Sequence, residues 1–259
     1  MEHNYKKIIE HTVNSPYLFE YNESHNIKID GIELNNKDDA LLCTNLVIEC
    51  GGNAIYNIPF SLYTKLSKTE NNLYFPVPDN MFSTIPISQL KYHRVFLTLR
   101  SGSANYIPYK LHYTIITTSD NFYCNRLVEE YYSIPLKSTN IINIPYFGTN
   151  KKLHGFYIES SKPIESLTVN VGNGSYVKKY DNFMLNNEIV QSNNDGYLYY
   201  FSIENIHDQV HFTQLSCQNI TLEFNVNTVG MVYSTYCNEF LLCDNMGALR
   251  WSYIKFLNN

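Results

Sequence analysis

The stretch Asn219-Ile-Thr-Leu-Glu-Phe-Asn-Val226 alternates apolar and polar residues without a break. Successive side chains of an extended strand point to opposite faces, so the four apolar residues of this stretch share one face and the polar residues the other. One polar and one apolar face are typical of antiparallel sheets that pack on one side only. The stretch therefore predicts a half-buried strand in an antiparallel sheet.

The same alternation recurs along most of the chain, for example at Val95–Leu99, Tyr109–Ile116 and Leu167–Val171. Turn residues fall where such runs stop, with Asn173-Gly174 and Asn194-Asp195-Gly196 as hairpin signals. Roughly 15 strand-like runs are too many for one eight-stranded sandwich and suit two. We expect few helices.

The clearest helical candidate is Phe60 to Ser67, and a second is Asn121 to Glu130 with Asp120 as its cap. No flexible linker divides the chain of 259 residues, and a boundary near residues 118–135 splits the strands evenly. We therefore predict two packed β-domains, at residues 1–125 and 126–259.

The composition restricts the class of partner and the source. The formal net charge is −5, which argues against nucleic acid because phosphate binding needs a surplus of Lys and Arg. Asn occurs 33 times and Tyr 23 times, whereas Ala and Arg occur four times each. Asn and Tyr have AT-rich codons and Ala and Arg GC-rich ones, so this skew indicates an AT-rich genome such as that of a large DNA virus or certain protists.

The N-terminus, Met1 to Lys7, is polar and leads into no apolar stretch, so no signal peptide is expected. No window is apolar enough to predict a transmembrane helix. The six cysteines include no C-x-x-C pair, and we expect reduced, mostly buried thiols in a protein made in the cytosol.

The chain contains none of the common motifs for nucleophilic, phosphate-binding, zinc-binding or dinucleotide-binding sites. His207 and His211 lie four apart, which brings imidazoles together only on a helix, and we expect an exposed loop there. The pairs Asp38-Asp39 and Glu129-Glu130 are interpreted as solvated turns. We predict no catalytic residue, no cofactor and no metal.

A few other residues deserve an interpretation. Cys124 near Arg126 is interpreted as a structural thiol rather than an activated one. The lysine pairs Lys151-Lys152 and Lys178-Lys179 are interpreted as solubilising turns or hairpin flanks. The aromatic runs Tyr131-Tyr132 and Tyr197 to Phe201 fit a buried core or a subunit contact, with a sugar-stacking platform as the alternative.

Two ordered sets of motifs resemble a known family. The first comprises Leu46 to Phe60, with its Glu-Cys-Gly-Gly-Asn turn, then Leu73 to Pro78 and Ile85 to Val95. The second comprises Ile164 to Gly174, Leu198 to Ser202, Phe212 to Leu215, Met231 to Asn238 and Met246 to Leu249. In this order they resemble the double jelly-roll major capsid proteins of nucleocytoplasmic large DNA viruses, and the chain would be a shortened member.

The resemblance implies an all-β fold of two packed antiparallel jelly-roll-like sandwiches. It also implies a virion structural protein that assembles with itself, as a homotrimer, and with other virion proteins, without catalysis. Low charge and abundant Tyr and Asn suit contact surfaces. The alternative is a β-sandwich that binds carbohydrate or protein through exposed tyrosines at Tyr197, Tyr199 and Tyr200. An enzyme on the same scaffold is a third possibility.

Overall fold

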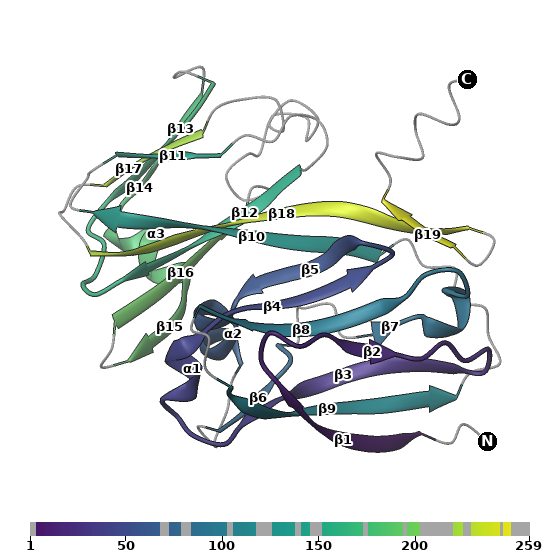
Figure 1. Cartoon of the computed structure of the whole chain (residues 1–259). Coiled ribbons are helices and arrows are strands. Elements are labelled where there is room, and N and C mark those ends of the chain that lie inside the picture. Colours follow the sequence, from purple (N-terminus) through teal and green to yellow (C-terminus); the bar gives the residue numbers. More distant parts are fainter. Residues whose placement is uncertain are drawn as a thin grey trace, which may run out of the picture. The chain divides into compact units, whose positions relative to one another are not determined.

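The computed structural model describes residues 4–67, 73–78, 84–102, 106–117, 126–137, 141–145, 152–172, 176–193, 196–202, 220–224, 229–243 and 246–249. The chain separates into two compact units (Figure 1). Unit 1 comprises Met1–Glu130 with Asn238–Asn259, and unit 2 comprises Tyr131–Cys237. Strands dominate both units, which confirms the predicted all-β class.

Unit 1 contains most of the described helical residues as well as two sheets. Its elements in chain order are β1 (Tyr5–Thr12), β2 (Tyr17–Phe19), β3 (His25–Leu34), α1 (Asp39–Leu42), β4 (Cys43–Cys50), β5 (Asn53–Pro59), α2 (Phe60–Leu66), β6 (Tyr74–Pro76), β7 (Thr84–Ile85), the 3₁₀ turn η1 (Ile87–Gln89), β8 (Val95–Ser101) and β9 (Pro108–Thr117). One sheet has the order β1-β9-β3-β6, with β7 also paired to β3. The other contains β5, β4, β8 and β2 in that order.

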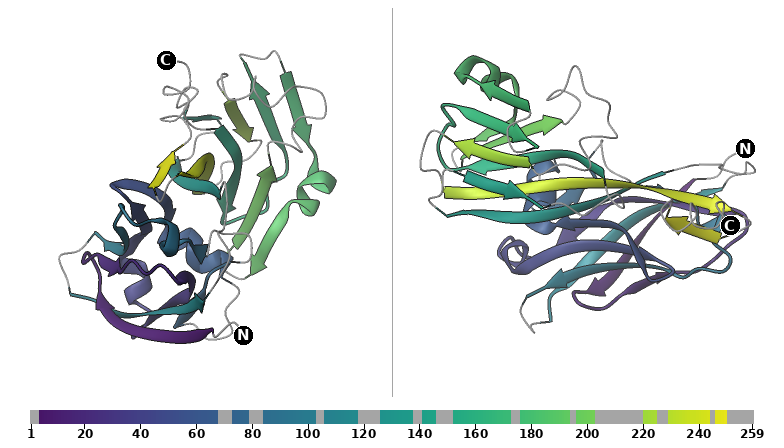
Figure 2. Two further views of the ribbon diagram at one scale, coloured as in Figure 1. Left: turned by 90° about the vertical axis from the view of Figure 1, so that its right-hand side faces the viewer. Right: turned by 90° about the horizontal axis from the view of Figure 1, so that it is seen from above.

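Two long strands pass along the chain from one unit into the other. They are β10 (Arg126–Lys137) and β18 (Val229–Cys243), and β18 is the long yellow strand in the right-hand view of Figure 2. In unit 1, β10 pairs with β5 in parallel at Glu129 and Glu130, a departure from the expected antiparallel pairing. The last described strand, β19 (Met246–Leu249), pairs antiparallel with β18.

The core of unit 1 forms where the alternating strands turn their apolar faces inward. Tyr109, Leu111, Tyr113 and Ile115 of β9 are all buried, as their spacing predicts. The aromatic ring of Phe19, on β2 in the other sheet, meets that of Tyr113 edge-on, with 5.5 Å between ring centroids. The two sheets therefore share one hydrophobic core. The helix α2 confirms the prediction for residues 60–67 and buries Phe60, Leu62 and Tyr63.

The glycine turn of the first motif set closes a tight hairpin. Cys50 of β4 pairs with Asn53 of β5, so Gly51 and Gly52 alone make the turn, with φ angles of 57° and 84°. Gly51 also donates a backbone hydrogen bond to Arg94 O at 3.1 Å. A Cβ atom at Gly51 would lie 2.4 Å from His93 Nδ1, so two motifs separated by some 40 residues meet in space.

Unit 2 also contains two sheets. Its remaining elements are β11 (Ile141–Ile144), β12 (Lys152–Ser160), β13 (Leu167–Val171), β14 (Tyr176–Tyr180), α3 (Asn182–Asn187), β15 (Ile189–Asn193), β16 (Gly196–Ser202) and β17 (Ile220–Phe224). One sheet has the order β11-β17-β13-β14, and the other places β15, β16, β12 and β18 in that order. Every described pairing among these strands is antiparallel.

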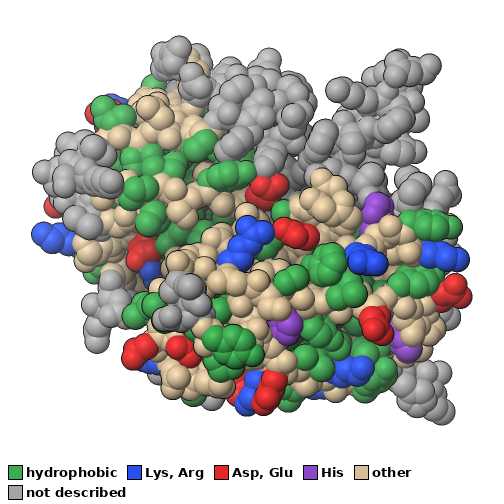
Figure 3. Space-filling view, in the orientation of Figure 1, with side chains coloured by type: hydrophobic (Ala, Val, Ile, Leu, Met, Phe, Trp, Pro, Cys, Tyr) green, Lys and Arg blue, Asp and Glu red, His purple; other side chains and the backbone are tan. Residues whose placement is uncertain are grey.

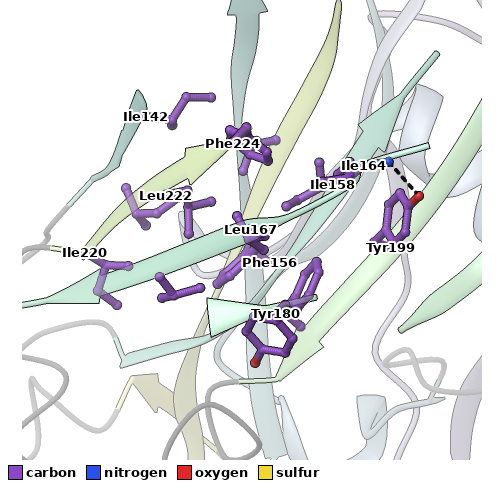
Figure 4. Packing of buried hydrophobic residues seen from close by; sticks show 14 of the residues in the cluster. Ile142, Phe156, Ile158, Ile164, Leu167, Tyr180, Tyr199, Ile220, Leu222 and Phe224 are labelled. Carbon is purple, nitrogen blue, oxygen red and sulfur yellow. Dashed lines mark hydrogen bonds between the residues drawn. The ribbon is translucent and has the colours of Figure 1, made fainter. Parts of the chain in front are cut away.

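Apolar side chains from both sheets of unit 2 form one core cluster (Figure 4). On β17 the residues Ile220, Leu222 and Phe224 are buried, which confirms the alternation from which the fold class was predicted. Val226 lies outside the described residues. The opposing sheet contributes Phe156 and Phe201, whose rings stack with 5.2 Å between centroids. Facing apolar layers of this kind define a β-sandwich.

The short helices differ from expectation in informative ways. Residues 126–130 belong to β10, so the predicted helix from 121 to 130 is wrong over that part, and its cap Asp120 lies outside the described residues. Two helices were missed, α1 and α3. Asp181 caps α3, because its carboxylate accepts a hydrogen bond from Met184 N at 2.9 Å. Both missed helices are too short for apolar periodicity to reveal.

The domain assignment stays a prediction. The N-terminal segment of unit 1 ends at Glu130, five residues beyond the expected boundary at residue 125, and unit 1 also includes Asn238–Asn259. The turn at Asn173-Gly174 lies outside the described residues, but Val171 and Tyr176 pair on either side of it.

Candidate functional site

The acidic and basic pairs of the sequence do not converge on a site in the part of the chain that the structure describes. Asp38 precedes α1 and is exposed, as expected for a solvated turn, whereas Asp39 is the first residue of α1 and is partly buried, so the turn interpretation is wrong at Asp39. Glu129-Glu130 was predicted to be a turn as well, which is wrong, because both residues belong to β10. Lys178 lies in β14 with its ammonium 5.2 Å from the centroid of the Tyr180 ring.

Other candidates fall outside the described residues. His207 and His211 do so, as do Cys124 and Lys151. Across the described ranges, no group of three or more His, Cys, Asp or Glu side chains is placed to hold a metal ion. In the same ranges, no helix is long and apolar enough to cross a membrane.

The two described cysteines whose side chains are placed, Cys43 and Cys50, are free thiols in the core of unit 1. Burial raises the pKa of each to about 12. A thiol is nucleophilic only as the thiolate, so neither is suited to attack a substrate. Both behave as small apolar core residues, as the sequence predicts.

The tyrosines of β16 do not form an exposed platform. Tyr199 is 2% exposed and belongs to the core cluster, with its hydroxyl accepting a hydrogen bond from Ile164 N at 3.1 Å (Figure 4). Tyr197 packs partly buried against the same cluster. Tyr200 points to the other face and its ring lies 4.6 Å from that of Tyr157, between centroids. The buried-core interpretation is therefore confirmed at Tyr199, and the three tyrosines do not share one face.

The solvent-facing side of the β1-β9-β3-β6 sheet contains a small ionic cluster that sequence reasoning missed. The carboxylate of Glu33, on β3, accepts a hydrogen bond from Lys110 Nζ at 2.9 Å and lies 2.7 Å from His112 Nε2. The hydrogen bond from Lys110 lowers the pKa of Glu33, with His112 adding to the effect. Tyr74 of β6 packs edge-on against the imidazole, at 4.9 Å between centroids. Because the carboxylate of Glu33 already pairs with both Lys110 and His112, the cluster links side chains of β3 and β9 and does not offer a free base.

Exposed apolar side chains are a second surface feature: half of the large ones in the described residues lie on strands that end a sheet, and the others lie on helices and connecting segments. Five strands that end a described sheet each bear at least one large exposed apolar residue: Tyr5 and Ile8 on β1, Leu18 on β2, Ile141 on β11, Val177 on β14 and Val190 on β15. Charged side chains of both signs are scattered over the face shown in Figure 3, with red and blue side chains adjacent in places. An edge strand with apolar side chains is a template for association with another chain.

The sequence signal for this surface is weak. The segments that form β1 and β14 contain apolar residues without regular alternation, and the sequence does not show that either lies at the end of a sheet. Strand order depends on pairing partners that are far apart in the sequence, as with β1 and β9.

Comparisons with known proteins show which solved structures have a similar fold. No family model and no curated protein matches the chain. Among solved structures, a quasi-atomic model of the PBCV-1 virus capsid is similar, with a TM-score of 0.58 and 11% identity over 96% of this chain and 97% of that chain. VP54 of PBCV-1, in a crystal structure fitted into a reconstruction of the virophage Sputnik, gives a TM-score of 0.57 and 10% identity over the same shares.

The major capsid protein P2 of bacteriophage PM2 gives a TM-score of 0.53 and 8% identity over 90% of this chain and 98% of that chain. The structural likeness therefore extends over nearly the whole length of this chain and of each matched chain, although the sequence identity is only 8–11%. The chain has the fold of the double jelly-roll major capsid proteins, as its ordered motifs predicted.

Proposed function

We propose that the chain is a virion structural protein, a capsid-like protein of a large DNA virus, which assembles through subunit contacts and performs no catalysis. The observation that carries the proposal is the placement of exposed apolar side chains on strands that end the described sheets. The capsid-protein fold supports it. Such edges are aggregation hazards in a lone subunit and become useful when a neighbouring subunit covers them.

The expected assembly is a homotrimer. Two jelly-roll-like domains per chain and three chains make a block with pseudo-hexagonal outline, which is how the resembling family tiles a shell. The block would contact other virion proteins, and the acidic balance of the chain makes nucleic acid an unsuitable partner. The protein would be made in the host cytoplasm and reside in the virion.

Mass measurement of the purified chain tests the assembly. One chain has a mass of 30.2 kDa, so light scattering or native mass spectrometry should give three times that value at micromolar concentration. A strict monomer at all accessible concentrations, together with absence of the chain from purified particles, would contradict the proposal.

Charged substitutions at the sheet ends test where the contacts lie. Val177→Lys on β14 and Val190→Lys on β15 replace an exposed apolar side chain of an end strand by an ammonium and should shift the mass toward the monomer. The matched control is Leu41→Lys on α1, which is 86% exposed but does not lie on a sheet edge. Equal loss of assembly in the control and the edge variants would show that the edges do not make the contacts.

A further inference from the structure

The strand β1 ends its sheet and has one long edge that faces away from β9 (Figure 1). It contains eight residues, Tyr5–Thr12, and pairs with β9 over its whole length without a register shift. No other strand in the described ranges pairs with it. The edge away from β9, which we call the free edge, therefore offers a regular row of backbone N–H and C=O groups to a further strand.

The pairing with β9 fixes which backbone groups of β1 face the free edge. Val13 N donates a hydrogen bond to Ile107 O at 3.0 Å, in continuation of the β1–β9 register. Successive residues of a strand direct their N–H and C=O groups to opposite sides, so the odd-numbered residues of β1 bond to β9. The even-numbered residues therefore face the free edge, among them Lys6, Ile8 and Glu10.

A hydrogen bond on the far side of β9 leads to the same assignment. Leu34 N of β3 donates to Leu73 O at 2.8 Å, on the side of β6. The residue before Leu34 therefore faces β9, where its partner is Lys110. Leu111, the next residue of β9, then faces β1, where its partner is Ile9. The assignment is thus the same from either side of β9.

A second copy of β1 can join the free edge antiparallel only in certain registers. Residues that exchange hydrogen bonds across the new pair must all face the free edge, so even-numbered residues meet even-numbered ones. When the two copies of Ile8 lie opposite each other, Lys6 of each copy lies opposite Glu10 of the other. Opposite charges directly across a strand pair stabilise it, and the two isoleucines make an apolar contact between them.

The neighbouring registers are all less favourable. A slip of two residues in one direction places Lys7 opposite Lys7, and a slip of four places Lys6 opposite Lys6. A slip of two residues in the other direction places Glu10 opposite Ile8, and a slip of four places Glu10 opposite Glu10. Like charges directly opposite each other are destabilising. The edge is therefore complementary to itself in the register centred on Ile8.

The side chains that this register pairs are accessible. Ile8 is 59% exposed, and Lys6 and Glu10 are exposed as well. They lie two residues apart, so they share one face of the sheet. Lys110 lies across from Glu10 in β9 but gives its hydrogen bond to Glu33, which leaves the Glu10 carboxylate for a lysine of a second copy.

A groove beside β1 has room for side chains on the other face of the added strand. It lies between β1 and β2, has a volume of about 440 Å³, and includes Lys7 in its lining. Its floor is aromatic, with Phe19 and Tyr113 each 4% exposed and in edge-on contact. In the register centred on Ile8, Ile9 of the second copy lies opposite Lys7 and points to the side of the groove.

We infer that β1 pairs antiparallel with β1 of a second copy, about a two-fold axis at Ile8. The inference rests on the assembly function proposed above and assigns β1 a contact within it. A three-fold block has no two-fold axis, so this contact joins one trimer to the next. One pair of strands is weak by itself, but each trimer presents three such edges, and several weak contacts reinforce one another in a shell.

Oxidative cross-linking detects such a contact even when it is weak. Ile8→Cys places one thiol of each copy at the two-fold axis, where Cα atoms of a hydrogen-bonded antiparallel pair are about 5.5 Å apart, within disulfide range. Under mild oxidation we expect a disulfide between two residue-8 peptides by mass spectrometry, and a species of twice the trimer mass. The matched control is Leu41→Cys, at an 86% exposed position away from the sheet edges, which should link far more slowly.

Charge exchange tests the register. In the Ile8→Cys background, Lys6→Glu or Glu10→Lys alone places like charges opposite each other twice and should slow the cross-link by roughly tenfold. Both substitutions together place opposite charges across the pair again and should restore the rate. Lys7→Glu makes the same change in net charge on the other face of the strand, opposite Ile9, and should slow the cross-link by less than about twofold.

Two results would overturn the inference: cross-linking of Ile8→Cys no faster than that of Leu41→Cys, or failure of the combined charge exchange to restore the rate. The mass of the unoxidised variants tests the trimer separately. A trimer whose β1 strands do not cross-link leaves the assembly proposal standing. A monomer whose β1 strands do cross-link supports the β1 pairing and contradicts the trimer.

Discussion

The core of unit 2 offers a direct test of the strand on which the fold prediction rests. Leu222 of β17 is fully buried, and its neighbours across the sheet are Ile142 of β11 and Val169 of β13. Leu222→Ala removes three buried carbon atoms, worth about 2.4 kcal/mol of transfer free energy at about 0.8 kcal/mol each. The cavity adds to this loss, because two stiff β-branched neighbours cannot collapse into the space. We expect a total loss of about 3–4 kcal/mol in the free energy of unfolding.

The assay is guanidinium unfolding followed by far-ultraviolet circular dichroism, at one fixed protein concentration because assembly would also stabilise the fold. With a denaturant slope of about 4 kcal/mol per molar, the midpoint of the unfolding transition should fall by about 0.9 M. Glu223→Ala is the control, since Glu223 is exposed on the opposite face of the same strand. The reasoning is refuted if Leu222→Ala loses less than about 1 kcal/mol or if the control loses as much.

Three further outcomes follow from the geometry of unit 1. Gly51→Ala should destabilise the fold by at least about 1 kcal/mol, because Gly51 has a positive φ and its Cβ would meet His93. The loss should be smaller in a His93→Ala background, and thermal unfolding of the wild type, both single variants and the double variant measures this. Cys43 and Cys50 should react with a thiol reagent only at the rate of unfolding, because burial raises the pKa of each to about 12. Any faster phase would come from the other cysteines, and it should persist unchanged in the Cys43→Ser and Cys50→Ser variants. The hydrogen bond from Lys110 lowers the pKa of Glu33 in the folded state, so the stability that Glu33 contributes is complete at neutral pH and is lost as the pH falls through the folded pKa. In Glu33→Gln the free energy of unfolding should therefore fall less steeply with decreasing pH, and an unchanged slope would show that the pairing has no energetic effect.

Much of the fold could be predicted because strand burial is a local property. The alternation over Tyr109–Ile115 and Ile220–Phe224 identifies which side chains are buried, since period two follows from the backbone geometry of a strand. Local sequence reasoning failed at β10, where Glu129-Glu130 was interpreted as a turn and Asn121 to Glu130 as a helical candidate. Its pairing with β5 involves residues some 70 positions away, and such a partner overrides local propensity.

Most of the candidate surfaces could not be predicted from the sequence. Alternating tyrosines in β16 favoured a buried core or a subunit contact, with an exposed sugar-stacking platform as the alternative, and only the burial of Tyr199 and its hydrogen bond from Ile164 N decided for the core. The groove is built from residues that extend from Tyr5 to Ile115 in the chain, with no motif to mark it. Its aromatic floor exists because β2 and β9, in different sheets, face each other at Phe19 and Tyr113.

The sequence by itself determined the all-β class, the inward face of the main strands and, through ordered motifs, the double jelly-roll fold. The tertiary structure alone decided which strands end a sheet, which tyrosines are buried and where a groove opens. The difference has a physical reason: alternation and turn chemistry act between neighbouring residues, whereas strand order and surface shape come from contacts between residues that are distant in the chain.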